Sequence, residues 1–356
     1  MRVLEISRVG LFKSLSPAGT DWIRWGAPLT AVEPHSSQSV ALAAVAATLR
    51  RLRAGGYDLV VLPAIQPDHK AGQPRGKLVA KAMLDAASRW QAGAVWLSRL
   101  MLGSTRHIIV DISDDRHLCQ PTMRLFPGHT LYFKRELDLD LGSWPQAPDR
   151  VRPLSLFLPD EHHRPSPHKD IDVFFAGALC NRVRTQALEA ASALSNLGFR
   201  VVTPGTPLPY AEFMATAARS WLVLSPEGYG WDCYRHYEAC LVGSVPVINR
   251  PSYRRHLYLE DLRHCFYYDA GADVLAERLR GFLTDKSRLL RMGAAGREHV
   301  LANHTRAAVA STMLSELGRV EPSLSREAEF ASGTPVFAGA PAGGQRLNHT
   351  GRDHGR

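Results

Sequence analysis

The chain has 356 residues, of which 45% are hydrophobic and 22% are charged. This is the composition of an ordinary globular protein with one large or two average domains, and it excludes a wholly disordered chain. No apolar run approaches the roughly 20 residues that cross a bilayer, so the sequence predicts no membrane span. The formal net charge of +9 favours anionic partners: nucleic acid, anionic lipid or phosphorylated small molecules.

The N-terminus and the cysteines favour a cytoplasmic location. Residues 1–10, MRVLEISRVG, predict a short strand that enters a glycine turn, without the apolar core and cleavage site of a signal peptide. The five cysteines are odd in number, and none forms a CxxC pair. Buried thiols in a reducing cytosol explain them most simply, because no second ligand pair completes a zinc site with His117 and Cys119.

In the first half of the chain, short apolar runs alternate with helical stretches. Continuous β-branched runs between helices favour a parallel sheet that is covered on both faces. Strands are expected at residues 3–6, 58–62, 107–112 and 131–133, with helices at 40–53 and 77–102. A Pro- and His-rich stretch without periodicity follows, and we interpret residues 151–169 as a linker.

The strand and helix alternation then restarts. Strands are expected at residues 172–175, 199–203, 221–225, 245–249 and 265–268, with helices at 182–197, 210–220, 233–242, 274–284 and 286–303. Two such arrays predict an α/β protein with two Rossmann-like domains, residues 1–150 and 170–320, that face each other across a cleft. Residues 321–356 are rich in Gly, Pro, Ala and Ser, which predicts a disordered tail.

One segment, residues 223–250, has the residues of a phosphate site. A buried strand leads into Ser225 and a loop with Gly228 and Gly230, and a helix with Arg235 and Glu238 follows. Glycines let the backbone approach an anion, helix N-terminal amides attract it, and an arginine can bind phosphate in a forked geometry. A carboxylate on the helix can accept ribose hydroxyls. Alternatively, Arg235 and Glu238 bond to each other along the helix surface.

This segment resembles the C-terminal domain of GT-B fold glycosyltransferases. The residues that carry the resemblance are Ser225-Pro226, the two loop glycines, Glu238-Ala239 and the run Gly243–Val247. Within this fold, the segment is most similar to uncharacterised bacterial glycosyltransferase-like proteins, and more loosely to the exostosin and spore-coat-maturation glycosyltransferase-like groups. Three further segments are similar to sequences of the same groups: IVDISDD (residues 109–115), YFKREL (132–137) and DVFFAG (172–177). The resemblance covers most of residues 107–305.

The resemblance implies a donor, an acceptor and no cofactor. A nucleoside diphosphate sugar would bind mainly to the C-terminal domain without an essential metal, and a hydroxyl acceptor would bind to the N-terminal domain. Glu227 fits the first glutamate of a pair found in many retaining enzymes, but Glu238 comes eleven positions later, where the family pattern has eight. Glu227 is therefore a candidate catalytic residue whose role is open, as is the choice between inversion and retention.

Further candidate residues lie near the carboxyl ends of predicted strands, where ligands bind in open α/β sheets. Gly177 and the arginines Arg182 and Arg184 could clamp the diphosphate, or the arginines could be exposed helix charges. An inverting transferase needs a general base for the acceptor hydroxyl. Asp114 is our first candidate and His35 the second; either could instead be a cap or surface residue.

The sequence thus predicts a cytoplasmic, metal-independent transferase that moves a sugar from a nucleoside diphosphate sugar to a glycan, a lipid-linked or a small-molecule acceptor. A peripheral contact with a membrane-bound acceptor is compatible with this reading. Two alternatives are a nucleotide-sugar epimerase on the same fold and a non-catalytic nucleic-acid-binding protein. The net charge favours the latter, but no helix-turn-helix, zinc-finger or RNP signature supports it.

Overall fold

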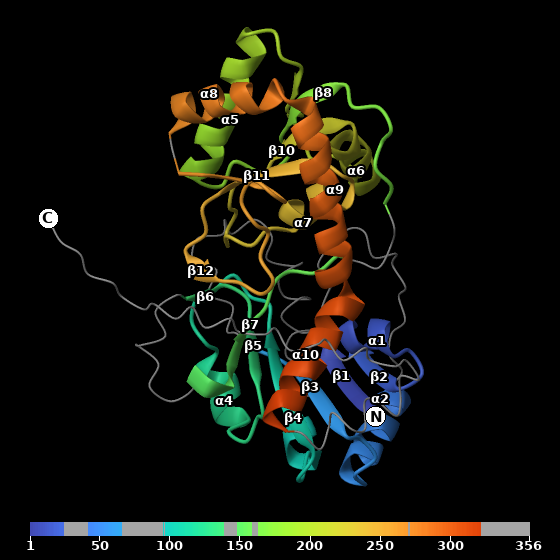
Figure 1. The fold of residues 1–356 in the computed structure, drawn as a ribbon. Coiled ribbons are helices and arrows are strands. Elements are labelled where there is room, and N and C mark those ends of the chain that lie inside the picture. The colour runs from blue at the N-terminus through green and yellow to red at the C-terminus, as the bar shows by residue number, and fades with distance from the viewer. Residues whose placement is uncertain are drawn as a thin grey trace, which may run out of the picture.

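The computed structural model forms two lobes, one above the other in Figure 1. It describes residues 1–24, 42–65, 95, 97–138, 148–158, 163–269 and 271–321. His35, most of the predicted helix 77–102 and all but the first residue of the predicted tail 321–356 lie outside these ranges.

The first lobe is built on a six-stranded parallel sheet with the order β2-β1-β3-β4-β5-β7. The central strands are buried apolar runs, as expected for a sheet covered on both faces. The strands are β1 (Val3–Ser7), β2 (Thr20–Arg24), β3 (Leu59–Pro63), β4 (Arg106–Asp111), β5 (Tyr132–Lys134) and β7 (Val151–Pro153), and the helices include α1 (Leu11–Leu15), α2 (Leu42–Arg53) and α4 (Gln120–Leu125).

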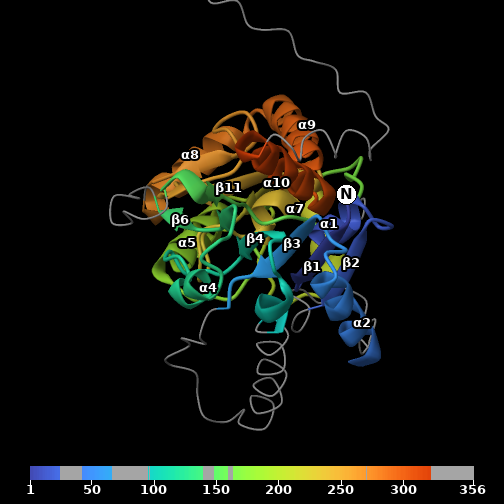
Figure 2. The same cartoon turned by 90° about the horizontal axis from the view of Figure 1, so that it is seen from below.

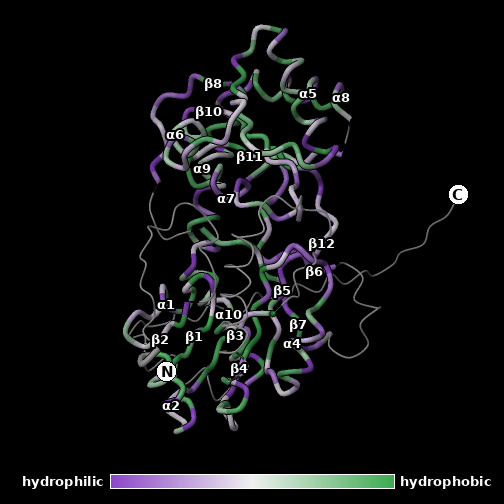
Figure 3. Tube along the Cα trace, turned by 180° about the vertical axis from the view of Figure 1, so that it is seen from behind, coloured by the Kyte–Doolittle hydropathy of each residue, from purple (hydrophilic) through white to green (hydrophobic). Residues whose placement is uncertain are grey.

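The second lobe contains a five-stranded parallel sheet with the order β13-β11-β10-β8-β9. Its strands are β8 (Ile171–Phe174), β9 (Val201–Val202), β10 (Ser220–Leu224), β11 (Val245–Asn249) and β13 (Phe266–Tyr268). Its helices are α5 (Arg182–Asn196), α6 (Tyr210–Ala218), α7 (Tyr234–Leu241), α8 (Ala272–Leu283) and α9 (Lys286–Asn303). Separate hydrophobic clusters line the two faces of this sheet, so it is a covered central layer. Figure 3 shows the strands of both sheets as the hydrophobic interior.

The last described helix, α10 (Arg306–Val320), returns to the first lobe (Figures 1 and 2). It packs against α1, and Val309, Met313 and Leu317 are buried in the same cluster as residues of β1 and β3. These side chains are four residues apart and therefore share one helix face. The predicted second domain ran to residue 320, but the structure places residues 306–320 in the core of the first lobe.

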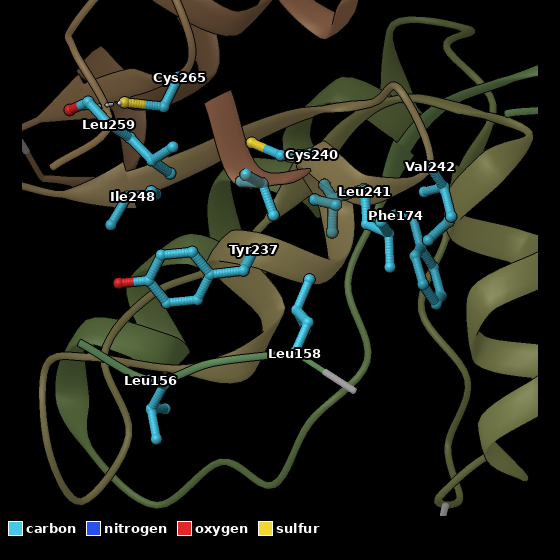
Figure 4. Packing of buried hydrophobic residues seen from close by; sticks show 14 of the residues in the cluster. Leu156, Leu158, Phe174, Tyr237, Cys240, Leu241, Val242, Ile248, Leu259 and Cys265 are labelled. Atoms are coloured by element: carbon cyan, nitrogen blue, oxygen red, sulfur yellow. Dashed lines mark hydrogen bonds between the residues drawn. The ribbon is translucent and has the colours of Figure 1, made fainter. Parts of the chain in front are cut away.

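The predicted linker, residues 151–169, is only partly a linker. Residues 151–153 form β7, which pairs with β5, and Leu154, Leu156 and Leu158 are buried. Leu156 and Leu158 lie near Tyr237 of α7 in Figure 4, within the core cluster of the second lobe. The chain therefore crosses between the lobes as a packed segment.

Further contacts join the lobes. The short strands β6 (Leu137–Asp138) and β12 (Tyr253–Arg254) pair antiparallel, one from each half of the chain. The two segments that cross between the lobes also bond to each other: the backbone N–H of Leu158 donates to the carbonyl of His304, which follows α9, and Ser155 Oγ lies 2.9 Å from His304 Nδ1. No helix among the described residues is both long enough and apolar enough to span a bilayer.

Candidate functional site

Two loops lie side by side at the carboxyl edge of the second sheet. Loop 175–181 follows β8, and loop 225–233 follows β10. β8 and β10 are paired neighbours, with Phe174 opposite Val223, so the loops leave the sheet at adjacent points. α5 and α7 begin directly after these loops. Ligands of open α/β sheets bind at this edge, which makes the two loops the candidate site.

Side-chain hydrogen bonds fix loop 225–233. Asn249, at the end of β11, accepts from the backbone N–H of Glu227 and donates to Glu227 Oε2, both at 2.8 Å. The indole of Trp231 donates to the Asn249 carbonyl at 2.8 Å. From the other loop, Asn181 donates to the carbonyl of Gly228 at 2.8 Å and to that of Glu227 at 3.1 Å. Asn181 also caps α5 by accepting from the N–H of Arg184.

Arg184 is buried between the two loops. Its Nε donates to the carbonyl of Glu227 at 2.9 Å, and its Nη1 donates to the carbonyl of Ala178 at 2.7 Å. The side chain therefore joins the loops to each other and leaves a positive charge between them.

Arg235, in the first turn of α7, has no such partners. Its Nε and Nη1 are buried and make no hydrogen bond with any described residue. Its Nε and Nη1 make no bond with Glu238, although the two opposite charges are close enough to attract each other. Burial lowers the pKa of Arg235, and the nearby Arg184 lowers it further. Buried donors without partners are rare and costly, so this guanidinium is poised for an anion.

Gly177 and Gly228 bring the two arginines up to the loop backbones. A Cβ at Gly177 would lie 2.6 Å from Nη2 of Arg235, and a Cβ at Gly228 would lie 2.7 Å from Nη2 of Arg184. Gly177 itself is exposed. The two guanidinium groups thus reach the loops only because these positions lack side chains.

Ser225 and Glu238 lie deeper in the lobe. Ser225 is fully buried, and its hydroxyl lies 2.7 Å from His236 Nδ1, while His236 Nε2 lies 2.9 Å from the Trp231 carbonyl. Burial lowers the pKa of His236 to about 3, which keeps the ring neutral. Burial raises the pKa of Glu238 to about 7, against the opposing effects of the nearby Arg235 and Tyr210.

In the first lobe, the turn between β1 and α1 already binds a carboxylate of the protein itself. Glu5, in β1, accepts from the N–H of Leu11 at 2.8 Å and from the N–H of Lys13 at 3.0 Å, both in α1. The carboxylate thus occupies the helix N-terminal amides that would otherwise be available to a ligand anion. Burial raises the pKa of Glu5 to about 7.

At loop 225–233 the lobes are in direct contact. Arg135 is buried, pairs with Asp114 and donates from Nη1 to the carbonyl of Asp232 at 2.7 Å. The N–H of Asp232 donates to Glu136 Oε1 at 2.6 Å. A Cβ at Gly230 would lie 2.6 Å from Glu136 Oε1 and 2.9 Å from Asp114 Oδ1. The carboxylates of the first lobe therefore lie against this loop of the second.

The structure brings together most of the residues that the sequence singled out. Gly177, Arg184, Gly228 and Arg235 form one group, and Gly230 lies against Asp114. Glu227 joins the group through its carbonyl. Arg182 is exposed and makes no hydrogen bond or ion pair with another described residue, whereas Ser225 supports the loop from beneath.

Sequence reasoning missed Asn181, Asn249 and Glu136. Asn181 had a detectable signal, because asparagine before a helix is a preferred N-cap. The contacts of Asn249 and Glu136 join positions 22 and 96 residues apart, which no local pattern reports.

Comparison with known proteins supports the assignment of the lobe. Residues 182–315 match the family described as "Glycosyl transferase-like". No curated protein matches the chain. Among solved structures, sucrose-phosphate synthase from Thermosynechococcus elongatus aligns with a TM-score of 0.52 and 13% identity, over 93% of this chain and 100% of that one.

Two further structures are similar. A glycosyltransferase from Rickettsia africae ESF-5 aligns with a TM-score of 0.50 and 10% identity over 89% of each chain. Anabaena HepE, solved in complex with UDP, aligns with a TM-score of 0.49 and 12% identity over 90% of this chain and 100% of that one. The likenesses to sucrose-phosphate synthase and to the Rickettsia glycosyltransferase confirm the predicted fold of two Rossmann-like lobes. The chain therefore has the fold of two Rossmann-like lobes that these structures share, and its residues 182–315 belong to the glycosyl transferase-like family.

Proposed function

We propose that the chain transfers a sugar from a nucleoside diphosphate sugar to a hydroxyl acceptor, and that the diphosphate binds between loop 175–181 and loop 225–233. The observation that carries this proposal is Arg235, whose Nε and Nη1 are buried without a partner among the described residues. Arg184 adds a second guanidinium to the same group. A diphosphate satisfies two adjacent guanidinium groups better than any neutral ligand does.

The charge distribution favours the second lobe as the donor side. In the first lobe, the carboxylate of Glu5 already fills the turn after β1. The second lobe instead has two arginines and two glycines at its sheet edge. We therefore infer that the first lobe binds the acceptor.

The same arginines suit the chemistry of transfer. When the glycosidic bond to the diphosphate breaks, negative charge builds up on the leaving oxygen. Fixed guanidinium groups in a partly buried site stabilise this charge without having to reorganise. Two such groups can take the part that a metal ion plays elsewhere, so we propose that transfer does not require a metal. Activity that persists after EDTA treatment would support this.

Further roles are proposed for three carboxylates. Glu238, which lies near Arg235 and Tyr210, would accept ribose hydroxyls. Asp114, on the first lobe and half exposed, would take the proton of the acceptor hydroxyl, since only one of its oxygens contacts Arg135. Glu227, oriented by Asn249, would lie beside the donor sugar.

A thermal-shift screen against nucleoside diphosphates and their sugars tests the donor site. A ligand that binds the native state raises the melting temperature, so at least one member should stabilise the wild type. Arg235→Ala should lose that shift, while Arg182→Ala, which changes an exposed arginine of the neighbouring helix, should keep it. A shift that survives in Arg235→Ala would contradict the proposed site. NMR of the product's anomeric proton would then show whether transfer inverts or retains configuration.

A further inference from the structure

Tyr229 stands out among the apolar side chains of the described residues. It is 87% exposed, more than any other large hydrophobic side chain there, and it makes no hydrogen bond or ring contact with another described residue. It lies at the apex of loop 225–233, between Gly228 and Gly230. When a ligand covers an aromatic ring that is exposed to water, the free energy of the complex is lowered.

The loop that carries Tyr229 is held from both ends. The backbone N–H of Gly228 donates to the carbonyl of Gly230 at 2.8 Å, which closes a tight turn around Tyr229. On one side of this turn, Asn181 and Asn249 hold Glu227 and Gly228. On the other side, Trp231 donates to the Asn249 carbonyl. A ring presented by a fixed backbone loses little conformational entropy on binding, as in a preorganised binding site.

The neighbours of Tyr229 place it between the two parts of the proposed reaction. Gly228 lies against Arg184, which belongs to the proposed diphosphate site. Gly230 lies against Asp114 and Glu136 of the first lobe, the proposed acceptor side. A hydroxyl that attacks the donor sugar must approach at this boundary, so the molecule that carries the hydroxyl passes Tyr229.

We propose that Tyr229 binds the acceptor by stacking on the apolar face of a sugar ring, and that the acceptor is therefore a carbohydrate with a pyranose ring. This inference rests on the proposed function. An aromatic ring is a flat, rigid contact surface, and a pyranose presents a matching face of C–H groups. The phenol oxygen is not needed for such a contact, so phenylalanine should replace tyrosine.

Saturation-transfer difference NMR tests the contact directly. The probes are the methyl pyranosides of glucose, galactose, mannose and N-acetylglucosamine, with glycerol as a hydroxyl compound that lacks a ring. We expect saturation transfer to at least one pyranoside and none to glycerol. Tyr229→Ala should lower the affinity about ten-fold, the scale of removing one aromatic anchor, and Tyr229→Phe should keep it. Tyr258→Ala, which removes another exposed tyrosine of the second lobe (54%), should have no effect.

Three results would overturn the proposal: no pyranoside binds, glycerol binds as well as the pyranosides, or Tyr229→Ala binds like the wild type. Binding of inorganic pyrophosphate is measured separately on the same samples. Its absence would contradict the donor site and leave the pyranoside result unaffected, so the two failures can be told apart. Normal pyrophosphate binding in Tyr229→Ala would also show that the variant is folded.

Discussion

At the scale of single residues, the balance between stability and function is clearest at Arg235. Its guanidinium is partly buried, two of its nitrogens lack partners among the described residues, and burial lowers its pKa. Such a group costs free energy in the folded protein until a ligand satisfies it. The same unpaired guanidinium therefore lowers the stability of the unliganded protein and strengthens the binding of an anion.

We therefore predict that Arg235→Met raises the free energy of unfolding by about 1 kcal/mol in the absence of ligand, the lower end of the cost of a buried unpaired polar group. Urea unfolding measures this change. Arg182→Met, at an exposed position of α5, should change the value by less than about 0.5 kcal/mol. A clear loss of stability in Arg235→Met would mean that the arginine is a structural residue.

Glu5 predicts a dependence of stability on pH. Its folded pKa of about 7 lies above the ordinary value of 4.5 because the carboxyl is buried. Between these values the folded state binds more protons at Glu5 than the unfolded state does, so the contribution of Glu5 to stability is greatest below pH 4.5 and is lost as the pH rises through 7. The fall from this group is at most about 3 kcal/mol. Glu5→Gln should flatten the curve of unfolding free energy against pH; an unchanged slope would contradict the account.

At the scale of elements, the site depends on Asn181, which serves a helix and a loop at once. Its side-chain oxygen caps α5, and its amide nitrogen holds the carbonyls of Glu227 and Gly228. Asn181→Ser should keep the cap and lose the loop contacts, whereas Asn181→Ala loses both. The alanine variant should be less stable than the serine variant by about 1 kcal/mol.

Hydrogen exchange checks the loop contribution of Asn181. Both variants should exchange the amides of residues 227–231 faster than the wild type. Asp285→Ala, which removes the cap of α9, serves as the control and should leave those amides unchanged. If the serine variant exchanges like the wild type, Asn181 does not hold the loop.

At the scale of the whole molecule, the chain passes from the first lobe to the second and back. α10 places Met313 (1% exposed) in the core of the first lobe, and Met292 of α9 (3% exposed) is in the core of the second. Two buried methionines on consecutive helices thus stabilise different lobes.

Met313→Ala and Met292→Ala should each cost about 2–5 kcal/mol, the usual range for such truncations. Hydrogen exchange should separate them, with faster exchange in β1 and β3 for Met313→Ala and in β10 and β11 for Met292→Ala. Faster exchange in β10 alone after Met313→Ala would contradict the placement of α10.

The sequence predicts the second lobe better than the first, for physical reasons. The continuous apolar run of β11 and the capped helix α9 were predicted with the bounds that the structure has. β2 was missed because TDWIR lacks a buried apolar run, and β7 was hidden by its proline. α10 was detectable from the four-residue spacing of Val309, Met313 and Leu317, but its lobe was not, since only tertiary packing decides it.

Some residues of the candidate site could likewise be predicted from the sequence, whereas their contacts with each other could not. Glycines and arginines next to predicted strand ends were visible because those positions follow from local pattern. That Arg235 would lie unpaired against Gly177, 58 positions earlier in the sequence, needed the fold. So did the contact of Gly230 with the first lobe.

The most direct measurement is calorimetric titration of inorganic pyrophosphate, because it tests the anion site without a choice of base or sugar. We predict that the wild type binds one pyrophosphate, that Arg235→Gln weakens binding about ten-fold or more through loss of a charge-assisted contact, and that Arg182→Gln binds like the wild type. Equal affinity of the wild type and a folded Arg235→Gln variant would contradict the assignment of the diphosphate to these loops.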